Sequence, residues 1–178
     1  MDFYEVISTR RSIRKYKRDE IPEDVLKRVL NAGRIAPSGS NRHAVRIIVI
    51  RDPERKKKMV PLCKGQEFVA DAPVLLAACA KNLNYNRGDY MGNFSMLVDG
   101  AIVVDHMTLT ARAEGLATCW IGSFSNDGIK KALSIPEDVN VVALTPLGYP
   151  ASNNLFSLPK DKKELEEIVY YEKWPDNV

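Results

Sequence analysis

The sequence predicts one globular domain in which helices alternate with strands. Its 178 residues are 45% hydrophobic and 28% charged, the size and composition of a single domain with a substantial core. Apolar residues recur at helical spacing in several segments. Two further segments, 45–50 and 74–80, are apolar runs of the length that strands have. A second independent domain is therefore not expected.

The N-terminal part is predicted to hold two helices and a strand. Helical spacing of apolar residues indicates a short amphipathic helix over residues 2–9. A second helix is predicted from Pro22, which suits a first helical position, to Gly33. A polar loop then leads into the strand at 45–50. The charged residues 51–58 are predicted to form a turn and a helix start with a solvated face.

The middle of the chain is predicted to form the core. The continuous apolar run 74–80 favours a central strand buried on both faces. Residues 81–92 are expected to form a mobile loop, whose Tyr85 and Tyr90 either cover a ligand or pack. The longest helix is predicted over residues 93–114, and it is either central to the core or shared with another subunit.

The C-terminal part is predicted to contain a strand over 116–124 that enters a loop, a short helix over 126–133 and a strand over 139–150. Large apolar residues then recur over 165–174. A terminus this apolar predicts an obligate homodimer, because exposed apolar patches usually mark interfaces. The alternative is that this segment folds back on its own domain.

Composition and motifs exclude several kinds of protein. A net charge of +3 is too small for a dedicated nucleic-acid binder. Three widely spaced cysteines without a CxxC pair indicate neither a disulfide framework nor a zinc site, so a cytoplasmic protein is expected. No signal peptide or membrane-spanning run is evident. The sequence lacks a GxGxxG turn, a P-loop and a Ser/His/Asp constellation, so a cofactor is expected to supply any chemistry.

Two polar segments are candidates for binding. Three arginines and a serine within residues 10–14 are suited to an anion, because guanidinium groups match phosphate oxygens. Arginines at a helix end, or a nucleic-acid backbone as the anion, are the alternatives. The loop at 36–43 offers several donors and acceptors to the edge of a flat heterocycle, although such residues also form ordinary turns.

Four segments, in this order, resemble the flavin-dependent nitroreductase family, and the resemblance covers nearly the whole chain. They are Arg10-Arg11-Ser12-Ile13-Arg14, Ala36-Pro37-Ser38-Gly39-Ser40-Asn41-Arg42-His43, Gly115-Leu116-Ala117-Thr118-Cys119-Trp120-Ile121-Gly122 and Leu147-Gly148-Tyr149-Pro150. The resemblance implies an α+β fold with a mixed, mainly antiparallel sheet wrapped by helices. It also implies an entwined homodimer that binds FMN between its subunits, with residues 164–178 packing on the partner.

The resemblance further implies an FMN enzyme that takes hydride from NADH or NADPH and reduces nitroaromatic, quinone or related acceptors in a ping-pong cycle. The implied contacts to the phosphate and ribityl chain are Arg10, Arg11, Ser12 and Arg14, with Lys162 closing on the phosphate. The implied contacts from the other subunit are Pro37, Ser38, Gly39, Asn41 and His43. The residues implied to line the ring are Cys119, Trp120, Ile121 and Gly122, with Gln66 a candidate for its edge.

The chain departs from the family pattern at one place in the polar loop. Relatives usually have Asn-x-Gln-Pro-Trp where this chain has Asn41-Arg42-His43-Ala44-Val45, so His43 is expected to replace an amide contact. Two alternatives to an enzyme stay open. One is a flavin-binding or regulatory module with little turnover, and the other is a small nucleic-acid-binding protein that uses residues 10–18.

Overall fold

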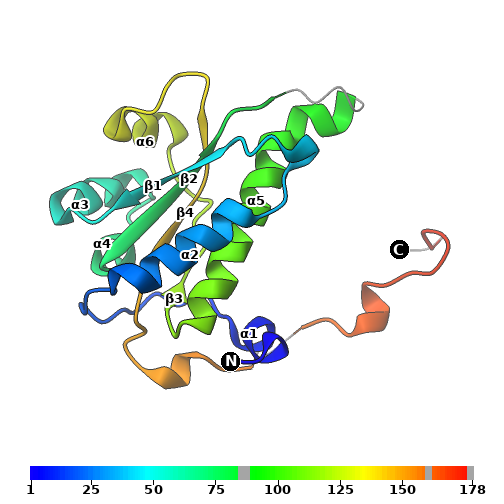
Figure 1. Ribbon diagram of the computed structural model, residues 1–178, viewed down its shortest axis with the longest axis horizontal. Coiled ribbons are helices and arrows are strands. Elements are labelled where there is room, and N and C mark those ends of the chain that lie inside the picture. Colours follow the sequence, from blue (N-terminus) through cyan, green and yellow to red (C-terminus); the bar gives the residue numbers. More distant parts are fainter. Residues whose placement is uncertain (84–88, 159–161, 176–178) are drawn as a thin grey trace.

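Four strands form the sheet at the centre of the fold, in the order β1-β2-β4-β3 (Figure 1). The structure is a computed structural model that describes residues 1–83, 89–158 and 162–175. The strands are β1 (Val45–Ile50), β2 (Val74–Ala80), β3 (Ala117–Thr118) and β4 (Asn140–Gly148). All neighbouring strands pair antiparallel, and the parallel pairing in the described residues is an isolated bridge between Ser12 and Thr118.

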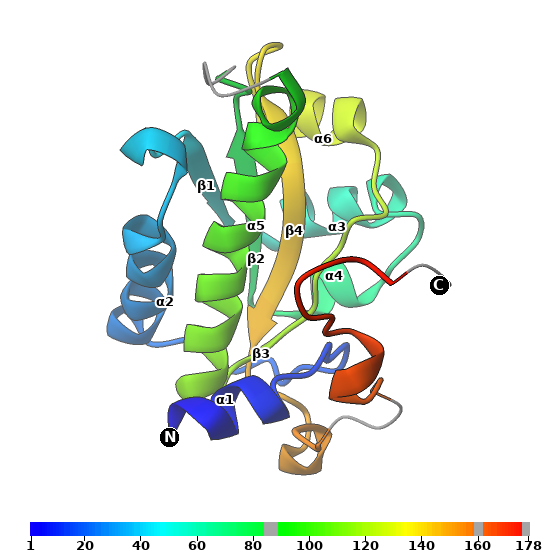
Figure 2. The ribbon, with the colours of Figure 1, turned by 90° about the vertical axis from the view of Figure 1, so that its right-hand side faces the viewer.

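Helices cover both faces of the sheet, with α2 and α5 on one face and α3, α4 and α6 on the other (Figure 2). The α-helices are α1 (Phe3–Thr9), α2 (Glu23–Ile35), α3 (Pro53–Leu62), α4 (Phe68–Asp71), α5 (Asp89–Ala113) and α6 (Asn126–Leu133). Three short 3-10 helices are η1 (Gly39–Asn41), η2 (Asn153–Leu155) and η3 (Leu165–Glu167). The helical segments predicted at 2–9, 22–33 and 126–133 are confirmed within a few residues.

Strand β2 is buried on both faces, as its continuous apolar run predicts. Leu76 and Ala78 face the core beneath α2 and α5. Leu75 and Ala77, the alternating residues, face the core beneath α3, α4 and α6. Successive side chains of a strand point to opposite faces, so an apolar residue is needed at every position of this strand.

Helix α5 is the longest helix and crosses one face of the sheet. It begins at Asp89, earlier than the predicted start at 93, so Tyr90 lies in the helix, while Tyr85 lies outside the described residues. Val103 and Met107 are buried against the sheet. Among the described residues, α5 is the one helix that is long and apolar enough to span a membrane. Its packing against the sheet, however, is what a core helix also shows.

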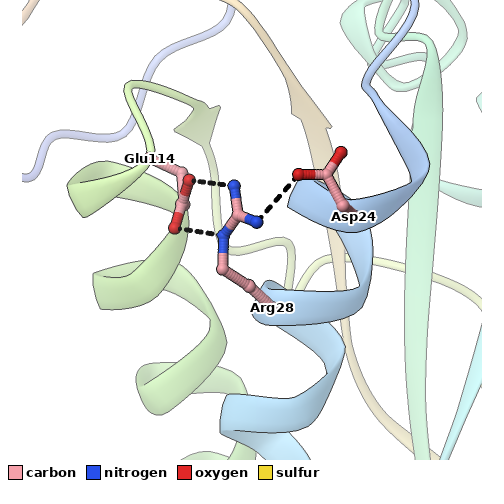
Figure 3. Close-up of polar contacts among 3 residues, drawn as sticks. All are labelled: Asp24, Arg28 and Glu114. Carbon is pink, nitrogen blue, oxygen red and sulfur yellow. Dashed lines mark hydrogen bonds and ion pairs between the residues drawn. The ribbon is translucent and has the colours of Figure 1, made fainter.

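An ion-pair cluster joins α2 to the C-terminal end of α5 (Figure 3). Arg28 donates to both carboxylate oxygens of Glu114, from Nε at 2.7 Å and from Nη2 at 2.9 Å. Its Nη1 donates to Asp24 at 2.9 Å, one turn earlier on α2. These hydrogen bonds to Arg28 hold the pKa of Glu114 and of Asp24 below the usual carboxyl range. The cluster links α2 to the residue that follows α5.

The strand predicted over 116–124 is shorter in the structure. Only Ala117 and Thr118 pair with β4, and Ile121 then makes an isolated bridge to Leu144. The other edge of this strand is used by the N-terminal segment, because Ile13 donates its backbone N–H to the carbonyl of Thr118 at 2.9 Å. Cys119 and Trp120 lie between two residues that pair with β4, Thr118 and Ile121, but belong to neither pairing.

The charged residues 51–58 do not form a wholly solvated face. Lys56 is buried, and its ammonium group donates to the backbone carbonyls of Ala72 and Pro73. These carbonyls lie just after α4, where the chain turns into β2. Helix α4 was not expected from the sequence. A buried lysine is tolerated here because its N–H groups find these acceptors.

The C-terminal tail, defined here as residues 162–175, extends away from the sheet and helices (Figure 1). Its large side chains are exposed, among them Leu165 at 61%, Tyr171 at 82% and Trp174 at 71%. Tyr170 and Trp174 stack edge to face on each other, with ring centres 5.3 Å apart. The tail does not fold back on its own domain.

Candidate functional site

The cationic segment, residues 10–14, runs from the end of α1 along the edge of β3. Asp2 caps α1 by accepting from the backbone N–H groups of Tyr4 and Glu5 at 3.1 and 3.4 Å. Arg10 then ends the helix. Ile13 is buried and fixes the segment against the domain, whereas Ser12 and Arg14 on either side are exposed. This alternation directs polar groups outward from one strand-like segment.

The positive charge of this segment is not neutralised by neighbours. In the described part of the chain, no carboxylate lies within ion-pair distance of Arg10, Arg11 or Arg14. The Arg14 guanidinium instead lies over the ring of Phe68, 5.8 Å from its centre. Unpaired guanidinium groups on a fixed backbone suit an anion with several oxygens, such as a phosphate group.

Cys119 lies beside the cationic segment and is buried. Burial raises the pKa of its thiol, although the charges of Arg14 and Arg10 and a hydrogen bond with Ser12 act in the opposite direction. The thiol is therefore neutral at physiological pH and unsuited to nucleophilic attack. The next residue, Trp120, is 38% exposed, so part of its indole is accessible from solvent.

Gln66 and Gly122 complete this half of the site. The amide nitrogen of Gln66 donates to the carbonyls of Cys63 at 2.8 Å and of Ser123 at 3.3 Å, so Gln66 lies against the chain just after Gly122. Ile121 differs from its neighbours, because its side chain is buried in the core with α3, α4 and α6. Its backbone N–H and carbonyl are both hydrogen-bonded to Leu144, so Ile121 can offer a ligand only van der Waals contact with its main chain.

The polar loop, residues 36–43, forms the second half of the site and is held in a strained conformation. Ser40, Asn41 and His43 have φ angles of 50°, 56° and 47°, a region that residues with a side chain seldom adopt. Within the loop, the His43 N–H donates to Ser38 Oγ at 2.9 Å, and His43 Nε2 pairs with Asn41 Oδ1 at 2.7 Å. Strain of this kind in non-glycine residues is common at functional sites.

Helix α5 holds the loop from one side. Asp99 Oδ1 accepts from the backbone N–H of Gly39 at 3.0 Å. A cavity of about 320 Å³ lies between the loop and the helix. Its lining includes Pro37, Ser38, Gly39, Met91 and Val98. This volume is at the lower end of the range of small-molecule pockets.

The two halves of the site lie at opposite ends of the subunit (Figures 1 and 2). The polar loop precedes the start of β1, which pairs with the end of β2 at Ala80. The cationic segment lies beside Thr118, which pairs with Leu147 near the end of β4. One subunit thus brings together Arg10, Ser12, Arg14, Gln66, Cys119 and Trp120, but it does not bring the polar loop to them. Lys162 is exposed at the start of the tail.

Sequence reasoning missed the residues that fix these halves in place. Asp99 and Arg112 lie on α5, where the other positions are mostly apolar, and both are nearly buried. Arg112 Nε donates to Thr9 Oγ1 at 2.9 Å, next to the start of the cationic segment. The presence of a charged residue among the apolar positions of a helix could have indicated them, because a buried charge requires a partner.

The comparisons with known proteins identify a family. The model of the Nitroreductase family matches residues 7–86 and 62–149. A protein of Methanothermobacter thermautotrophicus with the provisional name NADH dehydrogenase/NAD(P)H nitroreductase is 34% identical, over 98% of this chain and 88% of the relative. The FMN reductase [NAD(P)H] of Bacillus subtilis is 29% identical over 83% of this chain and 66% of its own length. The crystal structure of a nitroreductase family protein from Clostridium novyi superposes with a TM-score of 0.80 at 35% identity, covering 98% of this chain and 95% of that one.

Proposed function

The chain belongs to the nitroreductase family, and we propose that it is an FMN-dependent oxidoreductase that uses NADH or NADPH to reduce nitroaromatic, quinone or related electrophilic acceptors. The observation that best supports this is that, in the described residues, the cationic segment has no carboxylate partner and lies beside the strand end that continues into the buried thiol of Cys119 and the partly exposed Trp120. A phosphate group needs unpaired cationic side chains, and a flat heterocycle needs an aromatic or uncharged wall. The donor set therefore fits FMN.

In this proposal the residues of one subunit hold the phosphate and one edge of the cofactor. Arg10, Arg14 and Lys162 bind the phosphate, and Ser12 and Arg11 bind the phosphate or the ribityl chain. Trp120, Cys119 and the backbone at Ile121 and Gly122 line the ring, with Gln66 at its edge. Bound FMN would supply the redox chemistry, the acceptance of a hydride from NADH or NADPH and its transfer to the acceptor.

The protein side chains bind and orient in this mechanism, and none of them acts as an acid, base or nucleophile. Cys119 is the nearest candidate, but its raised thiol pKa keeps it protonated. The role left to Arg14 and the backbone near Gly122 is to orient the cofactor and to present positive charge near it. Replacing Cys119 by Ser is expected to leave flavin reduction by NAD(P)H intact.

We also propose that the site is completed in a homodimer. The separation of the two halves within one subunit supports this proposal. The polar loop of a second subunit could lie beside the cationic segment of the first, where the first subunit's own loop does not reach. Pro37, Ser38, Gly39, Asn41 and His43 would then contact the cofactor bound by the partner's cationic segment. The exposed tail supports it too, because the large side chains described between residues 165 and 174 are exposed on their own domain and would be covered if residues 164–178 packed on a second copy.

The single domain is proposed to act in the cytoplasm. All three cysteines are free and buried, which suits a reducing compartment. The +3 net charge gives no support to a nucleic-acid partner.

A flavin spectrum and a turnover assay test the function. The purified protein is expected to be yellow and to oxidise NADH or NADPH when benzoquinone or nitrobenzene derivatives are added. A yellow protein with negligible turnover across both acceptor classes would favour a flavin-binding module. A colourless protein that binds nucleic acid in a salt-dependent way would favour the third interpretation and contradict FMN binding.

A further inference from the structure

Arg112, in the last turn of α5, connects two segments that are distant in the sequence. Its side chain is nearly buried, with a residue exposure of 7%. Its Nε donates to Thr9 Oγ1 at 2.9 Å. Its guanidinium carbon lies 4.0 Å from the centre of the Phe156 ring. One side chain thus contacts both the end of α1 and the segment that follows β4.

The contact with Thr9 fixes the start of the cationic segment. Thr9 is the last residue of α1, and its hydroxyl also donates to the carbonyl of Glu5 within the helix. The same oxygen accepts from Arg112, so both hydrogen-bonding directions of the hydroxyl are used. Near the other end of the segment, the backbone N–H of Ile13 donates a hydrogen bond to the carbonyl of Thr118. Residues 10–12 are therefore held between two fixed points.

The contact with Phe156 fixes the end of the described segment that follows β4, on the side of the chain where Lys162 comes next among the described residues. This segment already runs beside the N-terminal one, since Lys17 N–H donates to the Tyr149 carbonyl and Ala151 N–H to the Lys15 carbonyl, both at 2.9 Å. Stacking of Phe156 on the guanidinium extends this pairing toward the tail. A stacked, hydrogen-bonded arginine has little freedom to turn toward a ligand.

We propose that Arg112 is a positioning residue for the phosphate half of the cofactor site, which it serves by fixing Thr9 and Phe156 and not by contacting phosphate. This inference rests on the proposed function, because it assumes that residues 10–14 and Lys162 hold the phosphate of FMN. Burial lowers the pKa of the Arg112 guanidinium, and the charge of Glu5 opposes this. The inference predicts an effect that is much larger on phosphate binding than on binding of the ring and ribityl chain.

Affinities for FMN and for riboflavin, measured by fluorescence quenching, test this inference because riboflavin has the ring and ribityl chain but no phosphate. The variants are Arg112→Lys, Thr9→Val and Phe156→Leu in the full chain. Arg28→Lys is the matched control, since it disturbs the Glu114 contact at the same end of α5 without touching Thr9 or Phe156. Thr9→Val is the mildest change, because it removes one hydroxyl at nearly constant volume.

The affinity for FMN is expected to fall about three- to tenfold in each of the three variants, while that for riboflavin changes by less than about twofold. The Thr9→Val/Arg112→Lys double variant is expected to bind FMN no more weakly than Arg112→Lys alone, because both changes remove the same Arg112–Thr9 hydrogen bond and the other hydrogen bond of Thr9 lies within α1. Parallel losses for both ligands, or an unchanged FMN affinity in Thr9→Val and Phe156→Leu, would overturn the inference. A wild-type protein that binds neither ligand would instead contradict the proposed function.

Discussion

Asp99 and Arg112 lie on the same helix and each holds one half of the candidate site. Asp99 accepts from the backbone of Gly39 in the polar loop, and Arg112 donates to Thr9 beside the cationic segment. At about 1.5 Å per helical residue, their positions on α5 are roughly 20 Å apart. The helix thus keeps the halves of one subunit apart, which supports a site shared by two subunits.

Replacing Arg10 or Arg14 by alanine is expected to weaken FMN binding by about 1.5–3 kcal/mol, the usual contribution of a charge-assisted contact. Flavin titration of Arg10→Ala and Arg14→Ala measures the effect. Lys57→Ala is the control, because Lys57 is exposed and pairs with Glu54 on α3. Equal FMN affinity in all three variants would remove the phosphate assignment.

Replacing Asp99 by alanine is expected to release the polar loop and to weaken FMN and riboflavin binding by the same factor. The loss of one hydrogen bond to a charged acceptor sets an upper limit of about 3 kcal/mol. Asp105→Ala, an exposed position on the same helix, is the control. A loss for FMN alone would mean that the loop acts on the phosphate and not on the ring.

The buried thiols are expected to lower stability at alkaline pH. Burial raises the pKa of both Cys63 and Cys79 from 9.0 to about 11. The unfolded chain therefore loses these protons at lower pH than the folded chain, so their stabilising contribution is complete below pH 9.0 and is lost as pH rises toward about 11. Urea unfolding across this range measures it.

The Cys63→Ala/Cys79→Ala double variant is the control for the other groups that titrate in the same range. Its free energy of unfolding is expected to fall less steeply with pH than that of the wild type. Identical slopes would show that the thiols ionise equally well in the folded protein.

Replacing Lys56 by methionine is expected to lower the free energy of unfolding by about 1–3 kcal/mol, because the carbonyls of Ala72 and Pro73 lose their buried donor. Thermal and urea unfolding measure the change. Lys57→Met is the matched control on the exposed side of the same helix. Two variants of equal stability would contradict a structural role for Lys56.

Removing residues 164–178 is expected to give a monomer that loses flavin, because the apolar tail would no longer join two subunits. Light scattering and a visible spectrum report both properties. Leu165→Glu is expected to weaken the dimer, whereas Glu166→Gln, its neighbour, is not. A truncated protein that stays dimeric and yellow would contradict the role of the tail.

The sequence alone predicted most secondary structure, because helices and strands depend on the spacing of apolar residues over a few positions. The buried strand at 74–80 and the helices at 2–9 and 126–133 are examples. Short motifs indicated the family in the same local way. The strand after Gly115 was overpredicted, since its length depends on which residues find partners on β4, and only Ala117 and Thr118 do so in the ladder.

The tertiary structure decided which residues of the site meet and which are held in place by residues outside it. Gln66 lies with the arginines, whereas the polar loop lies at the far end of α5, and no sequence spacing indicates either fact. Lys56 and Arg112 appear in the sequence as ordinary charged residues. Their roles depend on burial and on acceptors or rings far away in the chain, which exist only once the helices have packed on the sheet.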